Sequence, residues 1–542
     1  MTAPLSDSSG RLPRPVRPVG RPDDSPARYR TLWRWHFYAG LFVMPLLIVL
    51  ALTGTLYCFQ PQIEPLLYPS LLRVDPAGTP LARQTLLARA RDAMPAGAVA
   101  TTATIRTDAR SSAEFVFRRP DGESDSVYVD PYSGQILGTL SVEHRLMRQA
   151  RLLHRALLLG KPGELVMELA ACWTLVMLGT GLALWWPRLR QTGARAWLPE
   201  RAATRRNWWK SLHGALGAWL AIGGLAFVLT GMPWTGSWGQ QFKALVTRAG
   251  LGEAAGASHV HGDAPAGAAH AGHAAASGTD AAAMSGSRHG GPEGQGGHEG
   301  HGGHSAAAMH GRNESHAADG EQERLPQPGQ VANGAPQPPT RVDQLPVELT
   351  PWAAGLAAIP TGSSATPAQR LPLDRVVAIA AREGVVTGYD VALPTTPDGV
   401  YTVSYYPPDP QGERILNIDA RSGAIVKDLG YRQYGAVAKA VAYGTSLHMG
   451  RYFGLANQIA CAAISLGLLG LAVTGLLMWL KRRPRGRLAA PSRPLTAATM
   501  RAWVIGLACV GLVFPMMGAS LLLVWCVDRL AGRRLLSASA GR

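Results

Sequence analysis

Long apolar runs alternate with long polar segments along this chain. Each run holds about 20 or more residues with few or no charges, a length that matches a bilayer hydrocarbon core of roughly 30 Å. A helix in the core of a soluble protein rarely needs such a run. The pattern therefore predicts four transmembrane helices and a fifth near the C-terminus, at 37–58, 164–186, 212–231, 455–480 and 502–526.

The distribution of charge predicts how these helices are oriented. The 542 residues carry a formal net charge of +17, which can indicate nucleic-acid binding. However, 21 of the 53 Lys and Arg lie in the segments 1–36, 187–212 and 481–501, which flank the apolar runs. The positive-inside rule places these three segments in the cytoplasm and the long connections outside. We therefore expect membrane lipid as a partner and no nucleic acid. Basic residues after the fifth run leave the orientation of the C-terminus open.

These patterns predict a multi-pass protein of the bacterial inner (cytoplasmic) membrane with a cytoplasmic N-terminus. The first apolar run is too long for a cleaved signal, so we expect a retained helix. All five cysteines lie in or beside the runs, where they are expected as small apolar residues rather than disulfides. The first half is predicted to contain a disordered tail at 1–30, a transmembrane helix at 31–58, an outer module at 59–142, a transmembrane helix at 143–187 and a cytoplasmic loop at 188–207. The second half is predicted to contain a transmembrane helix at 208–232, a disordered His-rich insert at 250–345, a second outer module at 346–435, and transmembrane helices at 440–481 and 502–526.

Histidine, glycine and threonine recur at matched positions in the two halves. The first and third apolar runs read His-x3-Gly and reach Thr-Gly 17 residues after the histidine: His36, Gly40 and Thr53, then His213, Gly217 and Thr230. The second and fourth runs end in Thr-Gly with a histidine 26 residues upstream of the threonine: His154 and Thr180, then His448 and Thr474. Two coinciding spacings predict an internal duplication.

The outer segments repeat a second pattern. Residues 127–138 read VYVDPYSGQILG and residues 416–427 read LNIDARSGAIVK, so both carry Asp-x-x-Ser-Gly between β-rich runs. Asp and Ser bond the local backbone and Gly takes the positive-φ position, which predicts strand, tight turn, strand. Helical apolar patterns precede each at 81–94 and 371–384. We expect one helix and a small antiparallel sheet in each module.

The outer modules resemble PepSY domains, whose hallmark is a Val-x-Val-Asp-like strand followed by a Ser/Thr-Gly turn. The His-started runs that end in Thr-Gly, with Leu-Trp-Trp-Pro-Arg at 184–188, resemble the PepSY-associated transmembrane family. The resemblance covers roughly 30–250 and 340–485. It implies a polytopic α-helical membrane protein with two small α+β PepSY-like extracytoplasmic modules. The family includes inner-membrane reductases for ferric siderophores, so the resemblance also implies two b-type haems.

Four histidines are the candidate haem ligands. The predicted topology places His36 and His213 on the cytoplasmic side of the membrane and His154 and His448 on the outer side. Neutral imidazole is a good iron ligand, and Gly40 and Gly217, one turn from their histidines, leave space for a flat macrocycle. The alternative is that these histidines are interfacial and bond a carbonyl or a lipid headgroup. Two further candidates are His144, as a replacement ligand, and the acidic pair Glu164 and Glu168, whose alternative is an ordinary charge at a helix start.

Ten of the 15 histidines lie between residues 259 and 316, in a segment rich in Ala, Gly, Ser and Pro. This composition predicts disorder, because the segment cannot bury enough apolar surface to fold. Spacings such as that of His298, His301 and His304 suit transient binding of a divalent metal. The alternative is a flexible linker in which the histidines are incidental.

The sequence has no nucleophile motif and no nucleotide-binding loop, so no catalytic residue is predicted. Reducing equivalents must then come from an unidentified donor such as quinol, flavin or a reductase. We expect a di-haem electron-transfer protein that reduces a periplasmic ferric siderophore or another metal complex. The alternative is a non-enzymatic PepSY membrane protein that acts as an inhibitor, an assembly factor, or a metal-sensing or metal-capturing partner.

Overall fold

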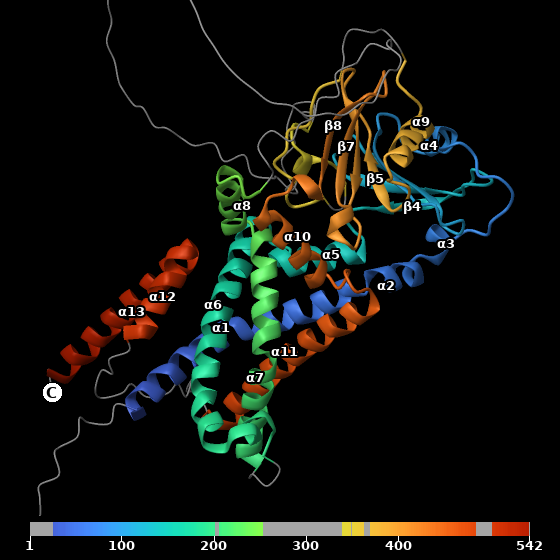
Figure 1. The fold of residues 1–542 in the computed structure, drawn as a ribbon. Helices are drawn as coiled ribbons and strands as arrows, with labels where there is room; N and C mark the ends of the chain where they lie inside the picture. Colours follow the sequence, from blue (N-terminus) through green and yellow to red (C-terminus); the bar gives the residue numbers. More distant parts are fainter. Residues whose placement is uncertain are drawn as a thin grey trace, which may run out of the picture. The chain divides into compact units, whose positions relative to one another are not determined.

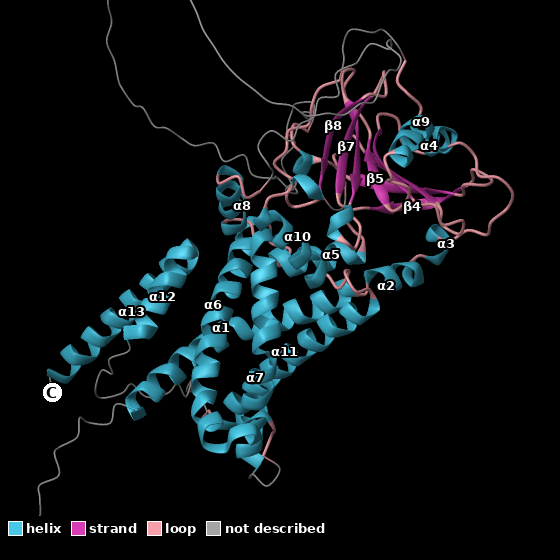
Figure 2. Cartoon of the chain, viewed as in Figure 1, coloured by secondary structure: helices cyan, strands magenta, loops and turns pink. Residues whose placement is uncertain are grey.

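The structure is a computed structural model that describes residues 25–200, 205–252, 339–347, 350–362, 369–483 and 501–540. The predicted metal-binding histidines His298, His301 and His304 lie outside the described residues. Figure 2 shows that the described strands gather in one sheet and that the spans are helical.

Four helices are long and apolar enough to cross a membrane, which confirms the first four predicted spans. α1 packs against α6 and α11, and α7 also packs against α6 and α11. The helices therefore form a closed ring in which α1 and α7 lie diagonally opposite each other. Their bounds are α1 (Ser25–Cys58), α6 (Lys161–Thr192), α7 (Arg205–Gly231) and α11 (Leu455–Arg482) (Figure 1).

The predicted single helices at 143–187 and 440–481 are wrong, because each is a short helix followed by a spanning one. α5 (Leu146–Ala156) precedes α6, and α10 (Ala436–His448) precedes α11. At the first break Leu157 and Leu158 have φ of 53° and 59°, which takes the chain out of the helix. At the second break Gly450 and Gly454 adopt φ of 73° and 56°. The short helices α5 and α10 carry His154 and His448.

The prediction of one fifth span at 502–526 is also wrong. α12 (Arg501–Val513) and α13 (Pro515–Ala540) are separate helices that meet at Phe514. Pro515 has no N–H to continue the first helix, and the apolar part of each helix is too short to cross a bilayer core. The indole N–H of Trp173 on α6 donates to the Ser520 hydroxyl at 3.2 Å, which joins α13 to the spans.

The two outer modules fold as one sheet rather than two. Eight strands pair in the order β4-β3-β2-β1-β5-β6-β7-β8, all antiparallel, and the central pairing of β1 with β5 joins the halves. The strands are β1 (Val99–Ile105), β2 (Ala113–Arg118), β3 (Ser124–Val129), β4 (Ile136–Ser141), β5 (Tyr389–Ala392), β6 (Val400–Tyr405), β7 (Arg414–Asp419) and β8 (Ile425–Gly430).

One hydrophobic core spans both halves of this sheet. It combines residues of α4 (Arg83–Asp92), α9 (Leu373–Arg382) and both sets of strands, including Leu86, Phe117, Val376 and Ile418. Asp374 of α9 accepts hydrogen bonds from the first backbone N–H groups of α4, at 2.7 Å from Arg83 and 3.0 Å from Gln84. These contacts place α4 and α9 side by side and confirm the helices predicted at 81–94 and 371–384.

The Asp-x-x-Ser-Gly turns form as predicted. Asp130 accepts the Ser133 hydroxyl at 2.6 Å and Asp419 accepts the Ser422 hydroxyl at 2.8 Å. Gly134 and Gly423 take φ of 73° and 75° between β3 and β4 and between β7 and β8. The remaining described helices are α2 (Gln60–Leu67), α3 (Pro69–Leu72) and α8 (Trp238–Arg248).

Candidate functional site

His36 and His213 meet between the diagonal helices α1 and α7. Their ring centroids are 6.2 Å apart and their planes are inclined at 81°. Both rings are half-buried. We call these two residues the distal pair, because they lie at the ends of α1 and α7 that are farther from the sheet.

Each of the four histidines is bonded to the threonine of a Thr-Gly motif on another helix. The ring Nδ1 is the bonding atom in every case. The four contacts are His36 to Thr180 at 3.1 Å, His213 to Thr474 at 2.9 Å, His154 to Thr53 at 3.0 Å, and His448 to Thr230 at 2.9 Å. In the sequence these threonines were evident only by their spacing from the histidines, and the recurrence of Thr-Gly was the signal that could have identified them as partners.

The threonine contacts determine which histidine nitrogen carries the proton. Each threonine hydroxyl donates its own proton to a backbone carbonyl one turn earlier, as Thr53 does to Val49 at 2.6 Å and Thr180 to Val176 at 2.7 Å. Thr230 and Thr474 do the same with Ala226 and Leu471. The hydroxyl oxygen must therefore accept the Nδ1–H of the histidine. This leaves the Nε2 lone pair of all four rings available to a metal.

The other two candidate ligands, His154 on α5 and His448 on α10, are called the module-side pair because these helices follow the last strand of each half of the sheet. Surrounding protein lowers the pKa of both imidazoles to about 4, and the nearby charge of His448 adds to the lowering at His154. Both rings are consequently neutral at physiological pH, the form that binds metals.

α1 and α7 each carry one histidine of the distal pair and one threonine that bonds a histidine of the module-side pair. α1 carries His36 and, 17 residues later, Thr53, which holds His154. At 1.5 Å per helical residue this separates the two levels by about 25 Å. α7 repeats the arrangement with His213 and Thr230. The two pairs therefore lie at different depths of the same four-helix ring.

Glycines control the space around the rings. A Cβ atom at Gly54 or Gly181 would lie 3.2 Å from Cε1 of His154 or His36, so a larger residue would push the ring away from the helix backbone. The predicted Gly40 faces open space, because an added Cβ would meet nothing within 4 Å. At Gly217 an added Cβ would lie 3.7 Å from Leu471, which is ordinary contact.

Two other predicted candidates have local structural roles. His144 is exposed and its Nδ1 bonds the Ser141 hydroxyl at 3.0 Å, away from the histidine pairs. Glu168 is buried and accepts the backbone N–H groups of Ser237 and Trp238 at the start of α8, both at 3.0 Å. This carboxylate satisfies N–H groups at a helix start.

The sheet holds the helix of His154 through a buried ion pair. Arg145, at the N-terminus of α5, binds the carboxylate of Glu114 on β2 at 2.5 Å and also donates to Tyr128 and Ser126. Burial would raise the pKa of Glu114, but the charges of Arg145 and Arg106 outweigh it and lower the pKa to about 2. The other half uses different contacts, since the Arg451 side chain after α10 donates to the Tyr406 carbonyl at 2.6 Å.

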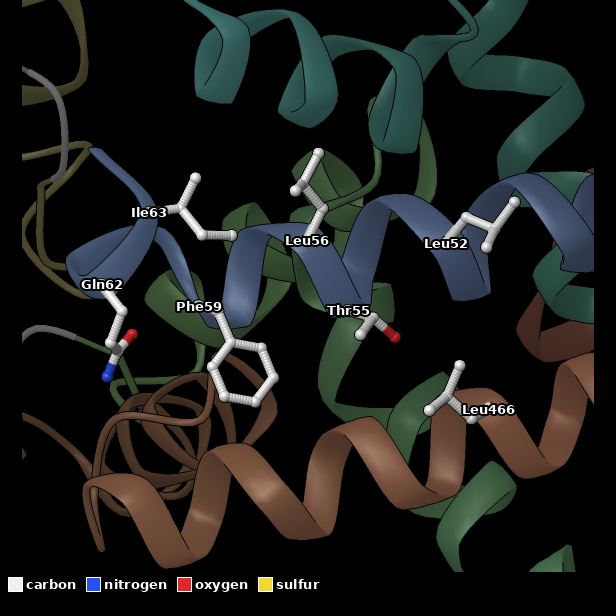
Figure 3. Close-up of a pocket in the computed structure, with 7 residues that line it drawn as sticks. All are labelled: Leu52, Thr55, Leu56, Phe59, Gln62, Ile63 and Leu466. Carbon is white, nitrogen blue, oxygen red and sulfur yellow. The ribbon is translucent and has the colours of Figure 1, made fainter. Parts of the chain in front are cut away.

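An apolar groove opens between α1, α2 and α11 (Figure 3). Leu52, beside Thr53, and Leu466 of α11 lie on its two sides, and Gln62 lies at one end. Gln62 donates to the Gln458 side chain at 2.8 Å, which joins α2 to α11. None of the four histidines lines this groove, so the histidine pairs are a separate feature of the described chain.

Comparison with known protein families identifies the family of this chain. The sequence profile described as the PepSY-associated TM region matches residues 33–482, from the start of the first span to the end of the fourth. The chain belongs to the PepSY-associated transmembrane family. A search among curated proteins returned no similar sequence.

The ring separation in the distal pair matches that of two imidazoles bound in line to one metal ion. Two imidazole nitrogens that each lie about 2 Å from one metal ion place their ring centres roughly 6 Å apart, and the observed separation is 6.2 Å. Among the residues that the structure describes, no cluster of three or more histidine, cysteine or acidic side chains forms. A metal held here would take two protein nitrogens, which is the ligand set of a bis-histidine haem.

Proposed function

We propose that this chain is a membrane electron-transfer protein that holds two b-type haems, one at each histidine pair, and reduces an oxidised metal complex such as a ferric siderophore. The observation that carries the proposal is the distal pair, with two Nε2 lone pairs and ring centres 6.2 Å apart. Bound haem iron supplies one-electron transfer by alternating between its ferric and ferrous states.

The residues of the chain would hold each group in a defined way. The histidines would hold the iron through their Nε2 atoms, and the threonines keep every ring in the Nδ1–H form. Gly40, where an added side chain meets open space, leaves one helix surface free for a flat macrocycle. Such second partners of a ligating histidine orient the ring and raise its basicity.

The basic segments orient the path that we propose. Arg188 and Arg190 lie in the last turns of α6, and Lys481 and Arg482 lie in the last turn of α11, at the distal ends of the spans. The positive-inside rule therefore favours a cytoplasmic position for the distal pair. The module-side pair then faces the periplasm together with the PepSY-like sheet. Electrons from a quinol, a flavin or a reductase would leave the cytoplasm in this direction. Reduction of ferric iron to Fe(II) weakens its binding by hard oxygen ligands, which would release the metal from its chelator.

Visible absorption of the purified full-length protein tests the proposal. We expect a dithionite-reducible b-type spectrum with two haems per chain. His36→Ala and His154→Ala should each remove about one haem, because each deletes one of two ligands at a different pair. His144→Ala is the control and should keep both. A protein without haem absorbance would refute the proposal and favour the non-enzymatic alternative, which predicts a stable complex with another envelope protein.

A second test uses the open space at Gly40. Gly40→Leu meets no protein atom at its Cβ and gains helix propensity of roughly 1 kcal/mol, so the protein itself should tolerate it. A macrocycle against this helix would be displaced, and we expect loss of the distal haem. Gly506→Leu on α12 is the matched control, since a Cβ there also meets nothing within 4 Å. Equal haem content in both variants would contradict the proposed placement.

A further inference from the structure

Two cysteines from opposite halves of the chain meet near the module-side pair. Cys58 is the last residue of α1, and Cys461 lies in the second turn of α11. They are 7% and 3% exposed. Both are unbridged thiols, and their side chains interact with each other. The sequence, in which no two cysteines are close, gave no sign of this contact.

The break between α10 and α11 contacts both sulfurs. A Cβ at Gly450 would lie 3.5 Å from the Cys58 sulfur, and the Cys461 sulfur lies 3.2 Å from the Leu447 carbonyl and 3.7 Å from the His448 carbonyl. Gly450 takes φ of 73° at this point, so its position depends on glycine. Both sulfurs therefore lie against the same break.

Cys461 takes part in hydrogen bonds with neighbouring residues. Its S–H donates to the Leu447 carbonyl at 3.2 Å, and the Asn457 amide donates to its sulfur at 3.4 Å. These contacts distinguish Cys461 from a cysteine that packs only among apolar side chains.

The thiol pair lies next to the module-side histidines. Gly54 contacts the ring of His154, and Cys58 is four residues further along α1, on the same helix face. On the other side, the Cys461 sulfur lies 3.7 Å from the His448 carbonyl. The predicted topology places this end of the spans on the oxidising side of the membrane, where disulfides form and persist.

We propose that Cys58 and Cys461 form a reversible disulfide that links α1 to α11 beside the module-side pair. The oxidant is a disulfide of the extracytoplasmic compartment. The Cys461 thiolate attacks one oxidant sulfur, which breaks the oxidant S–S bond and releases one of its thiolates. The Cys58 thiolate then attacks the Cys461 sulfur and releases the second. The two cysteines lose two electrons and two protons, and the oxidant gains both as two thiols.

The bond also changes the contacts of the neighbouring helix end. A disulfide sulfur has no proton, so Cys461 would stop donating to the Leu447 carbonyl, one residue before His448. The Asn457 amide, at 3.0 Å, and the Gly450 N–H, at 3.1 Å, would remain as donors to that carbonyl. Oxidation of the pair would therefore remove one hydrogen bond from the end of α10. This inference does not depend on haem binding.

Counting free thiols in the full-length protein tests the proposal. The protein is equilibrated with oxidised glutathione, quenched in acid, denatured and alkylated with N-ethylmaleimide, and its intact mass is measured. The chain has five cysteines, so we expect five adducts when reduced and three (five minus two) after oxidation, with no glutathione mass added. Cys172→Ala, the control for a buried cysteine away from the pair, should fall from four adducts to two.

Cys58→Ala and Cys461→Ala should each retain four adducts or gain the mass of glutathione, because the cysteine that remains of the pair has no neighbouring thiol with which to form an intramolecular disulfide. A wild-type protein that keeps five adducts in oxidised glutathione would overturn the proposal. So would a Cys58→Ala variant that still loses two adducts without added mass, since another pair would then be responsible. Neither readout uses haem, so the outcome is separable from that of the proposed function.

Discussion

The hydroxyl of Thr230 gives the sharpest test of how the histidines are held. It accepts Nδ1–H of His448 at 2.9 Å, and for this histidine no backbone carbonyl shares the proton among the described contacts. Thr230→Val keeps the shape of the side chain and removes the acceptor. Leaving a donor without a partner costs about 1–3 kcal/mol. We therefore expect a loss of roughly 10-fold to 100-fold in metal affinity at the module-side pair, the range found for partners of ligating histidines.

The assay is the transfer of haem from the purified protein to an excess of a high-affinity apoprotein, followed by absorbance. Two haems at two sites should leave in two phases, and Thr230→Val should accelerate one phase at least 10-fold. Thr230→Ser retains the hydroxyl and should stay close to wild type. Thr55→Val is the matched control, because Thr55 also donates to a carbonyl one turn earlier, at 2.7 Å, but holds no histidine. If Thr230→Val releases both haems at the wild-type rate, the hydroxyl does not orient the ring.

Three further predictions follow from the same contacts. Arg145→Met removes the closest cation from buried Glu114 and should lower the free energy of unfolding by about 3–5 kcal/mol, measured by denaturant titration in detergent; an unchanged midpoint would contradict the ion pair. The imidazoles of the module-side pair have pKa values of about 4 in the folded protein and about 6.5 in the unfolded chain, so the unfolded chain binds more protons below pH 6.5. The free energy of unfolding of the haem-free protein should therefore fall by about 3 kcal/mol per histidine as the pH falls to about 4, with no change above pH 7. A free energy of unfolding that stays constant across this range would show that the fold does not keep the rings neutral. Gly181→Ala places a Cβ 3.2 Å from a ring carbon and should reduce haem content, whereas Gly475→Ala, at 3.6 Å, should not; equal loss in both would rule out a steric cause.

Much of the local structure follows from short-range pattern. The apolar runs predict the four spans, because a bilayer core requires helices of that length and composition. The two Asp-x-x-Ser-Gly turns form between paired strands, because Asp, Ser and Gly each satisfy a local backbone requirement. The single helices predicted at 143–187 and 440–481 left out the breaks before α6 and α11. At the first break the chain leaves the helix at Leu157 and Leu158, which carry no glycine or proline signal, and at the second Gly450 and Gly454 take positive φ. The prediction of a single fifth span was also wrong, because the length of the apolar run suggested one helix although Pro515 divides it into two.

The pairing of distant segments could not be read from the sequence. Spacing related His36 to Thr53 within one helix, whereas in the fold His36 bonds Thr180 and Thr53 bonds His154. Periodicity gives the face of a helix but not its neighbour, and the ring of α1, α6, α7 and α11 decides which threonine meets which histidine. The union of two modules into one sheet has the same origin, since any exposed strand edge can pair and only the assembled chain brings β1 to β5.

The sequence by itself thus determined the membrane character, the repeated His and Thr-Gly positions, and the strand-turn-strand units, all of which depend on interactions between near neighbours in the chain. Only the tertiary structure decided that His36 meets His213, that a threonine of another helix bonds Nδ1 of each of the four imidazoles, and that Cys58 lies beside Cys461. These depend on which helices pack together, and that choice is made by side-chain contacts between segments far apart in sequence.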